Sequence, residues 1–160
     1  MRGRPCRSIG EQTASERLRA LTRTVILDTG PLVAFLSHRD RYHRWTSEQW
    51  AEIEPPLLIC EAVLSEACFL LRKSPAGPAA ALELIDRGVA RVAYDIEDDV
   101  DALARLMTRY ADVPMSLADA CLVRMTERLP GATVITLDRD FRVYRSHGRR
   151  VIPTIMPSDI

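Results

Sequence analysis

The chain has 160 residues, with 22 Lys+Arg against 22 Asp+Glu, 47% hydrophobic residues and 6% aromatic residues. This length and composition are typical of one globular domain and leave little room for a second. No uninterrupted apolar run exceeds five residues, whereas a membrane-spanning helix needs about 20. The first two dozen residues also lack the apolar stretch of roughly 7–15 residues found in secretory signals. We therefore expect a cytoplasmic protein with no membrane partner.

Charge and cysteine usage exclude further classes. Residues 1–24 carry six Arg and two Glu, a net charge of +4, which the remaining chain balances with −4. A wholly basic nucleic-acid binder is therefore excluded. Cys6, Cys60, Cys68 and Cys121 show no CxxC spacing, so neither a disulfide scaffold nor a zinc ribbon is expected.

The N-terminal segment 1–23 differs from the rest of the chain. Gly and Pro interrupt any periodic pattern there, and only 14–21 could form a short helix. We expect a basic arm that is either disordered or the product of a start site placed too early. The domain itself is expected to span 24–160.

From residue 24 onward, short β-branched apolar runs alternate with longer helical patterns. This alternation predicts a three-layer α/β/α fold with a mostly parallel central sheet. The expected strands are 24–28, 57–60, 91–94, 133–137 and 150–152, and the expected helices are 31–38, 43–53, 61–72, 77–87, 97–110, 117–129 and 139–145.

Acidic residues follow several of these predicted strands. Asp28 and Asp138 come directly after strands, with Asp140 two residues further on, and Asp119 falls in the first turn of a helix that Ser116 is expected to cap. Ligands collect at the carboxyl ends of parallel strands, so these acids are expected to meet at one edge of the sheet.

Glu66 is expected to join this acidic group. It lies in the helix after the second predicted strand, among apolar neighbours, and a buried Glu needs a partner or a metal. Taken one at a time, the acids could serve only as helix caps or turn residues. Together they would repel unless a divalent cation neutralised them, and oxygen ligands without His or Cys select Mg²⁺ or Mn²⁺. Such a site supports phosphodiester hydrolysis.

Four short segments resemble motifs of the PIN-domain family, and in particular the VapC-type toxins of bacterial toxin–antitoxin pairs. They are VILDTGPL at 25–32, AVLSEA at 62–67, MSLADA at 115–120 and TLDRDF at 136–141. The similarity covers about residues 24–156, and four weak motifs in the right order are together fairly specific.

The resemblance implies a metal-dependent ribonuclease. In the family, the positions of Asp28, Glu66, Asp119 and Asp138 bind Mg²⁺ or Mn²⁺ and catalyse RNA cleavage, with the position of Asp140 as a supporting ligand. Thr29 matches a hydroxyl position beside the first Asp. The resemblance also implies a cognate antitoxin, whose peptide would bind in a groove near the helix of Trp45 and Trp50 and the helix of Glu66. A homodimer is also expected. Two other acids compete for places in this set. Glu61 lies at the strand–helix junction, but the family spacing and the apolar setting favour Glu66, and Asp112 is expected to be a loop residue.

Positive charge near the acids would receive an RNA backbone. Two clusters qualify, one over 39–44 and the other formed by Arg139, Arg142 and Arg145. Trp45 and Trp50 could stack on bases, but their spacing in an amphipathic helix favours packing in the core or at a partner interface.

Three alternatives remain to be compared with this interpretation. A receiver domain needs a Lys after a late strand, where this chain has Asp138-Arg139-Asp140, and a haloacid-dehalogenase-like phosphatase needs an Asp where Gly30 stands. Both are disfavoured. A PIN fold serving as an RNA-binding or RNA-processing module, without a toxin role, stays open.

Overall fold

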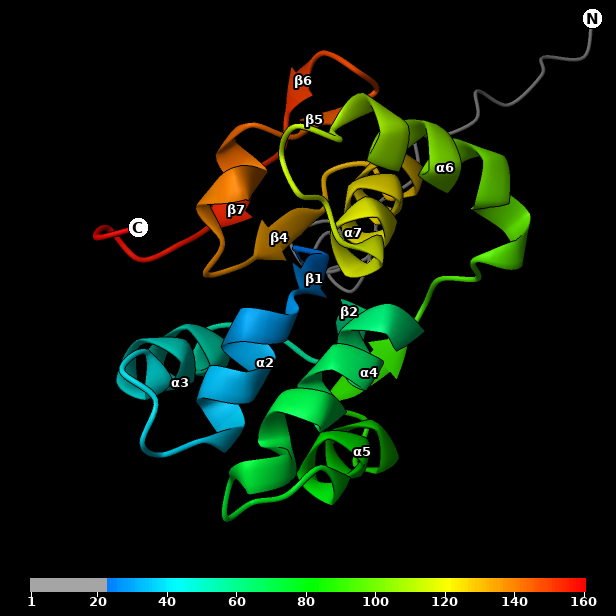
Figure 1. Cartoon of the computed structure of the whole chain (residues 1–160). Helices are drawn as coiled ribbons and strands as arrows, with labels where there is room; N and C mark the ends of the chain where they lie inside the picture. The colour runs from blue at the N-terminus through cyan, green and yellow to red at the C-terminus, as the bar shows by residue number, and fades with distance from the viewer. Residues whose placement is uncertain (1–22) are drawn as a thin grey trace, which may run out of the picture.

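The structure is a computed structural model that describes residues 23–160, so the arm expected over 1–23 lies outside the described residues except for Arg23. Its centre is a parallel five-stranded sheet in the order β3-β2-β1-β4-β7 (Figure 1). The strands are β1 (Val25–Leu27), β2 (Leu57–Ile59), β3 (Ala90–Val92), β4 (Thr133–Ile135) and β7 (Thr154–Ile155).

Helices flank this sheet and produce the expected three-layer α/β/α arrangement (Figure 1). Helix α7 packs against β1 and β4, and α6 packs against α7. The α-helices are α2 (Thr29–Leu36), α3 (His43–Ala51), α4 (Glu61–Leu70), α5 (Ala79–Asp86), α6 (Val100–Arg109) and α7 (Leu117–Arg128). Short 3₁₀ turns are η1 (Leu71–Lys73), η2 (Glu97–Asp99) and η3 (Arg139–Arg142).

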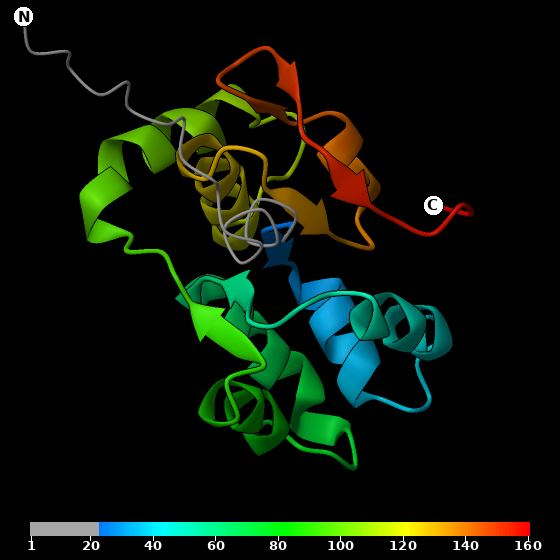
Figure 2. The same cartoon turned by 180° about the vertical axis from the view of Figure 1, so that it is seen from behind.

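The C-terminal part of the chain differs from expectation. The helix predicted over 139–145 is wrong, because η3 ends at Arg142 and β5 (Arg145–Ser146) follows. The strand predicted over 150–152 forms, as β6 (Arg150–Val151), but it pairs with β5 in a separate antiparallel hairpin. The fifth strand of the main sheet is β7, at the edge opposite β3 (Figure 2).

The core follows from the apolar strands. All residues of β1, β2 and β4 are buried, as expected for central parallel strands covered on both faces. Within residues 23–160, no helix is long and apolar enough to cross a membrane.

The strand register fixes which residues meet at the carboxyl ends. Leu27 of β1 pairs with Ile135 of β4, so the next residues along, Asp28 and Thr136, lie side by side. The backbone N–H of Asp28 donates to the carbonyl of Ile135 at 3.1 Å, which holds the end of β1 against β4.

Candidate active site

Asp28 lies at the junction of β1 and α2 and is only 6% exposed. One carboxylate oxygen, Oδ1, accepts a hydrogen bond from the backbone N–H of Thr29 at 2.6 Å and so caps α2. The other, Oδ2, accepts from the hydroxyl of Thr136 at 2.6 Å. Both oxygens are thus fixed by neighbours that the β1–β4 register supplies.

The environment of Asp28 disfavours its charge. Burial raises the pKa of Asp28 to about 7, against the lowering effect of the hydrogen bonds from Thr136 and Thr29. The nearby carboxylates of Asp119 and Asp138 raise this pKa further. These three predicted acids therefore lie within electrostatic reach of one another.

Glu66 is tied to the same place from α4. The Thr29 hydroxyl donates to Glu66 Oε2 at 2.9 Å, linking α2 to α4 beside Asp28. The expectation that Glu66 is deeply buried is wrong, because its side chain is half-buried and the nearby Phe69 and Leu70 are exposed. The hydrogen-bond partner expected for Glu66 is the Thr29 hydroxyl.

Asp119 reaches the site from the first turn of α7. Its carboxylate accepts from the Ser116 backbone N–H at 2.9 Å, and the Ser116 hydroxyl accepts from the Asp119 N–H at 3.1 Å. This capping box is the one that the sequence predicts. Burial raises the pKa of Asp119, and the carboxylates of Asp138 and Glu66 act in the same direction, so Asp119 has both as neighbours.

Asp138 follows β4 and begins η3. Its backbone N–H donates to Thr136 Oγ1 at 2.8 Å, and its carboxylate accepts from the Asp140 N–H at 2.9 Å. Thr136 therefore links two of the acids, since its oxygen accepts from Asp138 and its proton goes to Asp28. Asp140 is half-buried on the same turn.

The donor set fits a hard divalent cation. All the acids present oxygen, and a cation would offset the burial and repulsion that push the Asp28 pKa to about 7. Over residues 23–160, however, no three His, Cys, Asp or Glu side chains are arranged to hold a metal. Each acid is instead turned to a local hydrogen-bond donor, namely Thr29 and Thr136 for Asp28, Thr29 for Glu66, Ser116 for Asp119 and Asp140 for Asp138.

Of the predicted basic residues in this segment, Arg139 and Arg142 are exposed, whereas Arg145 is half-buried. Arg139 is exposed directly after Asp138. The Arg142 guanidinium donates to the carbonyl of Ile160, and the Arg145 guanidinium donates to the carbonyls of residues 142, 143 and 144. Arg145 therefore serves the local backbone.

The aromatic residues of α3 pack inward, as their spacing favours. Trp50 is 7% exposed, and its ring lies 4.1 Å from that of Phe35, centroid to centroid. Trp45 is half-buried against the core.

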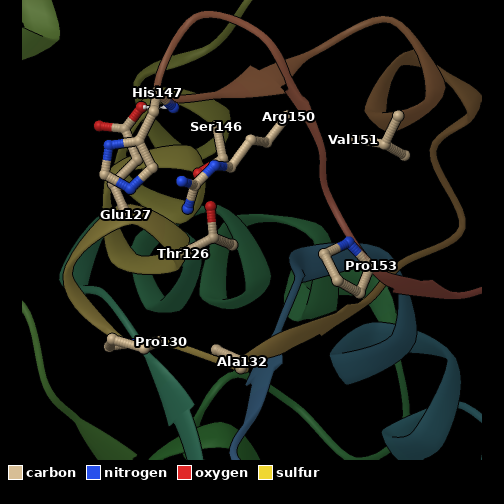
Figure 3. Close-up of a pocket in the computed structure, with 10 residues that line it drawn as sticks. Thr126, Glu127, Pro130, Ala132, Ser146, His147, Arg150, Val151 and Pro153 are labelled. Atoms are coloured by element: carbon tan, nitrogen blue, oxygen red, sulfur yellow. Dashed lines mark hydrogen bonds between the residues drawn. The ribbon is translucent and has the colours of Figure 1, made fainter.

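A separate cavity of about 260 Å³ lies at the other end of α7 and β4 (Figure 3). Its lining includes Glu127, Ala132, His147 and Arg150. Glu127 is already engaged, because it accepts from the backbone N–H of His147 and pairs with Arg124. Since α7 and β4 carry the acids at their opposite ends, this cavity is not part of the acidic site.

The sequence does not predict two residues that lie beside the acids. Thr136 is fully buried, and the signal that could have found it is a polar residue that ends an apolar strand two positions before Asp138. Tyr144 is also fully buried, and the carboxylates of Asp119, Asp138 and Asp140 lie near its hydroxyl. No local pattern marks Tyr144, because its position depends on η3.

Comparison with known proteins agrees with the fold and the motifs. The PIN domain profile matches residues 25–146. Ribonuclease VapC26 of Mycobacterium tuberculosis is 28% identical over 119 residues, which cover 72% of this chain and 87% of the relative.

Two solved structures share the fold. Mycobacterium tuberculosis VapC20, described as a toxin that cleaves the sarcin–ricin loop, matches with a TM-score of 0.68 and 20% identity, over 75% of this chain and 94% of that one. DNA-bound VapBC from Salmonella typhimurium matches with a TM-score of 0.50 and 16% identity, over 84% and 98%. The family match runs from β1 through β5 and includes every predicted acid, and this chain therefore belongs to the PIN domain family.

Proposed function

We propose that this chain is a divalent-metal-dependent endoribonuclease and the toxin of a toxin–antitoxin pair. The observation that carries the proposal is the meeting of Asp28, Asp119 and Asp138 at the carboxyl end of the sheet, with Glu66 joined to them through Thr29. The relatives named as a ribonuclease and as a toxin support the same reaction class.

The proposed roles follow from the chemistry of the site. Asp28, Glu66, Asp119 and Asp138, with Asp140 as a supporting ligand, would hold Mg²⁺ or Mn²⁺. The cation would supply Lewis-acid stabilisation of the charge that develops as a phosphodiester is cleaved. Thr29 and Thr136 orient the acids through hydrogen bonds. Exposed Arg139 and Arg142 are proposed to meet the RNA phosphates, because guanidinium groups pair with phosphate oxygens.

An exposed apolar surface on α4, beside the site, is proposed to bind the antitoxin. A hollow on α4 is lined by Ser65, Glu66, Phe69 and Leu70, and the two apolar residues are 59% and 55% exposed. Apolar side chains of a partner covering Phe69 and Leu70 would lie next to Glu66 and obstruct the acids. The Salmonella structure contains a VapBC assembly bound to DNA, which supports a partner of this kind.

The remaining proposals concern the whole protein. We assign the nuclease domain to residues 24–160, because β7 pairs with β4 beyond the end of the family match. A homodimer and a cytoplasmic location belong to the same proposal. Light scattering of the purified protein tests the dimer.

The test of the function is cleavage of total RNA by purified protein with Mg²⁺ or Mn²⁺, compared with EDTA and with Asp28→Asn. We expect cleavage only with metal, and a loss of at least about 100-fold in the variant, because several kcal/mol of transition-state stabilisation disappear. Asp112→Asn is the matched control, because this acid is exposed in the loop before α7, and it should cleave like wild type.

Two results would contradict the proposal. If Asp28→Asn cleaved RNA as fast as wild type, Asp28 would have no role in catalysis. No cleavage by folded, antitoxin-free protein on any RNA, including a sarcin–ricin loop fragment, would favour an RNA-binding or RNA-processing module.

A further inference from the structure

Tyr144 stands in a rigid aromatic group beside the acidic site. It follows η3, its side chain is fully buried, and its backbone N–H donates to the carbonyl of Asp140 at 3.0 Å. Its ring meets the edges or faces of Phe141 and Tyr110 at centroid distances of 5.4 and 5.1 Å and interplanar angles of 80° and 71°. Packing of this kind fixes the direction of the hydroxyl.

The Tyr144 hydroxyl has no hydrogen-bond partner in the described part of the chain, although it is buried. A buried, unpaired hydroxyl costs free energy, so native proteins seldom keep one without a reason. The neighbouring Tyr110 shows the usual situation, because its hydroxyl accepts from the Arg145 backbone N–H at 3.0 Å.

The groups near the Tyr144 hydroxyl are acidic. The carboxylates of Asp119, Asp140 and Asp138 all lie near the hydroxyl, and that of Asp119 comes within reach of a hydrogen bond from it. A tyrosine hydroxyl is a hydrogen-bond donor, and carboxylate oxygens are acceptors, so this hydroxyl lies among groups that can accept its proton.

Asp119 offers the matching acceptor. Its Oδ2 accepts from the Ser116 N–H, whereas the hydrogen bonds formed within residues 23–160 leave Oδ1 without a donor. We propose that the Tyr144 hydroxyl donates to the Asp119 carboxylate when the site holds its cation, and thereby fixes the orientation of that carboxylate. Tyr144 is thus a positioning residue, and this assignment rests on the metal-dependent activity proposed above.

The test compares Tyr144→Phe with wild type and with Tyr110→Phe, which loses a hydroxyl from the same aromatic group. Mn²⁺ affinity is measured by calorimetry on otherwise metal-free protein, and kcat and KM are measured on an RNA that wild type cleaves. We expect Tyr144→Phe to bind Mn²⁺ about 10-fold more weakly, as when other residues that orient metal ligands are lost. Its kcat should fall while KM for RNA stays unchanged, and Tyr110→Phe should bind Mn²⁺ like wild type.

A third readout separates positioning from folding. The thermal midpoint of metal-free Tyr144→Phe should equal or exceed that of wild type, because only an unpaired hydroxyl leaves the interior. If wild type binds Mn²⁺ and Tyr144→Phe binds it equally well, the role of Tyr144 is overturned while the proposed function stands. If wild type neither binds Mn²⁺ nor cleaves RNA, the role falls together with the proposed function.

Discussion

At the residue scale, Asp28 is a carboxyl group in surroundings that favour its neutral form. Its pKa is about 7 in the folded protein, against 3.8 for the ordinary value. Because the folded state binds this proton more tightly than the unfolded state, the stability it contributes is full below about pH 4 and is lost as pH rises through 7. At about 1.4 kcal/mol per pKa unit, the upper bound of this loss is about 4 kcal/mol.

We therefore predict that Asp28→Asn is more stable than wild type at pH 8 in EDTA, by about 1–3 kcal/mol, and equally stable near pH 4. The amide oxygen keeps the N-cap acceptor for Thr29 while the charge is gone. Urea unfolding at several pH values measures the difference. Parallel pH profiles for the two proteins would show that Asp28 is not the group responsible.

The sequence predicts which acids form the candidate site, but it does not predict the contacts that support them. Asp28 and Asp138 follow strands that local apolar patterns reveal, and the capping box of Asp119 is a local motif. The bond from Thr136 to Asp28 joins residues 108 positions apart and depends on the register of β1 with β4. The half-burial of Glu66 likewise depends on which side of α4 faces the sheet, and its neighbours in sequence do not determine that.

At the element scale, a cluster of charges joins η2 and α6 to α7. Asp99, 8% exposed, accepts from the Tyr94 hydroxyl at 2.9 Å and pairs with Arg124 and Arg128, each at 3.0 Å. The hydrogen bond from Arg124 holds the pKa of Asp99 below its ordinary value, against the effect of burial. The stability that Asp99 contributes is therefore present above about pH 4 and lost as the solution becomes more acidic.

Replacing Asp99 should weaken the contact between these elements and lower the free energy of unfolding. We predict that Asp99→Asn lowers the free energy of unfolding at pH 7 by about 2–3 kcal/mol, because it leaves two arginines without their shared buried partner. Asp98→Asn is the control, since Asp98 is 67% exposed and lies 3.8 Å from Arg128, and it should cost less than about 1 kcal/mol. Urea unfolding measures both, and equal losses would mean that burial of Asp99 contributes nothing.

Elements at the C-terminus were the hardest to predict. β7 has two residues and lies between Pro153 and Pro157, so its own sequence has no strand pattern. Its strand geometry comes from pairing with β4, through bonds such as Val134 N–H to the Pro153 carbonyl at 2.9 Å. The hairpin turn at His147 and Gly148, with φ of 48° and 73°, was hidden by basic residues that fit a helix end equally well.

At the scale of the whole molecule, the acidic site and an exposed apolar surface adjoin one another. Glu66 is bonded to Thr29 beside Asp28, and one turn later on α4 come Phe69 and Leu70, both largely exposed. Large exposed apolar side chains beside a functional site are typical of a protein-binding surface. A single partner could therefore both cover this surface and block access to the acids.

Binding of the partner and cleavage of RNA should then be separable by substitution. We predict that Phe69→Ser weakens binding of the proposed cognate antitoxin by about 30-fold, since removing an aromatic anchor from an interface costs about 2 kcal/mol. RNA cleavage by the free protein should stay unchanged, because the Phe69 side chain is 59% exposed and its ring stacks on the Arg72 guanidinium, whose Cζ lies 3.5 Å from the ring centroid. Val100→Ser, on α6 with a similar exposure of 55%, is the matched control and should bind the partner normally. Equal weakening by both variants, measured by calorimetry, would place the partner elsewhere, whereas selective weakening by Phe69→Ser with full nuclease activity would locate inhibition on α4.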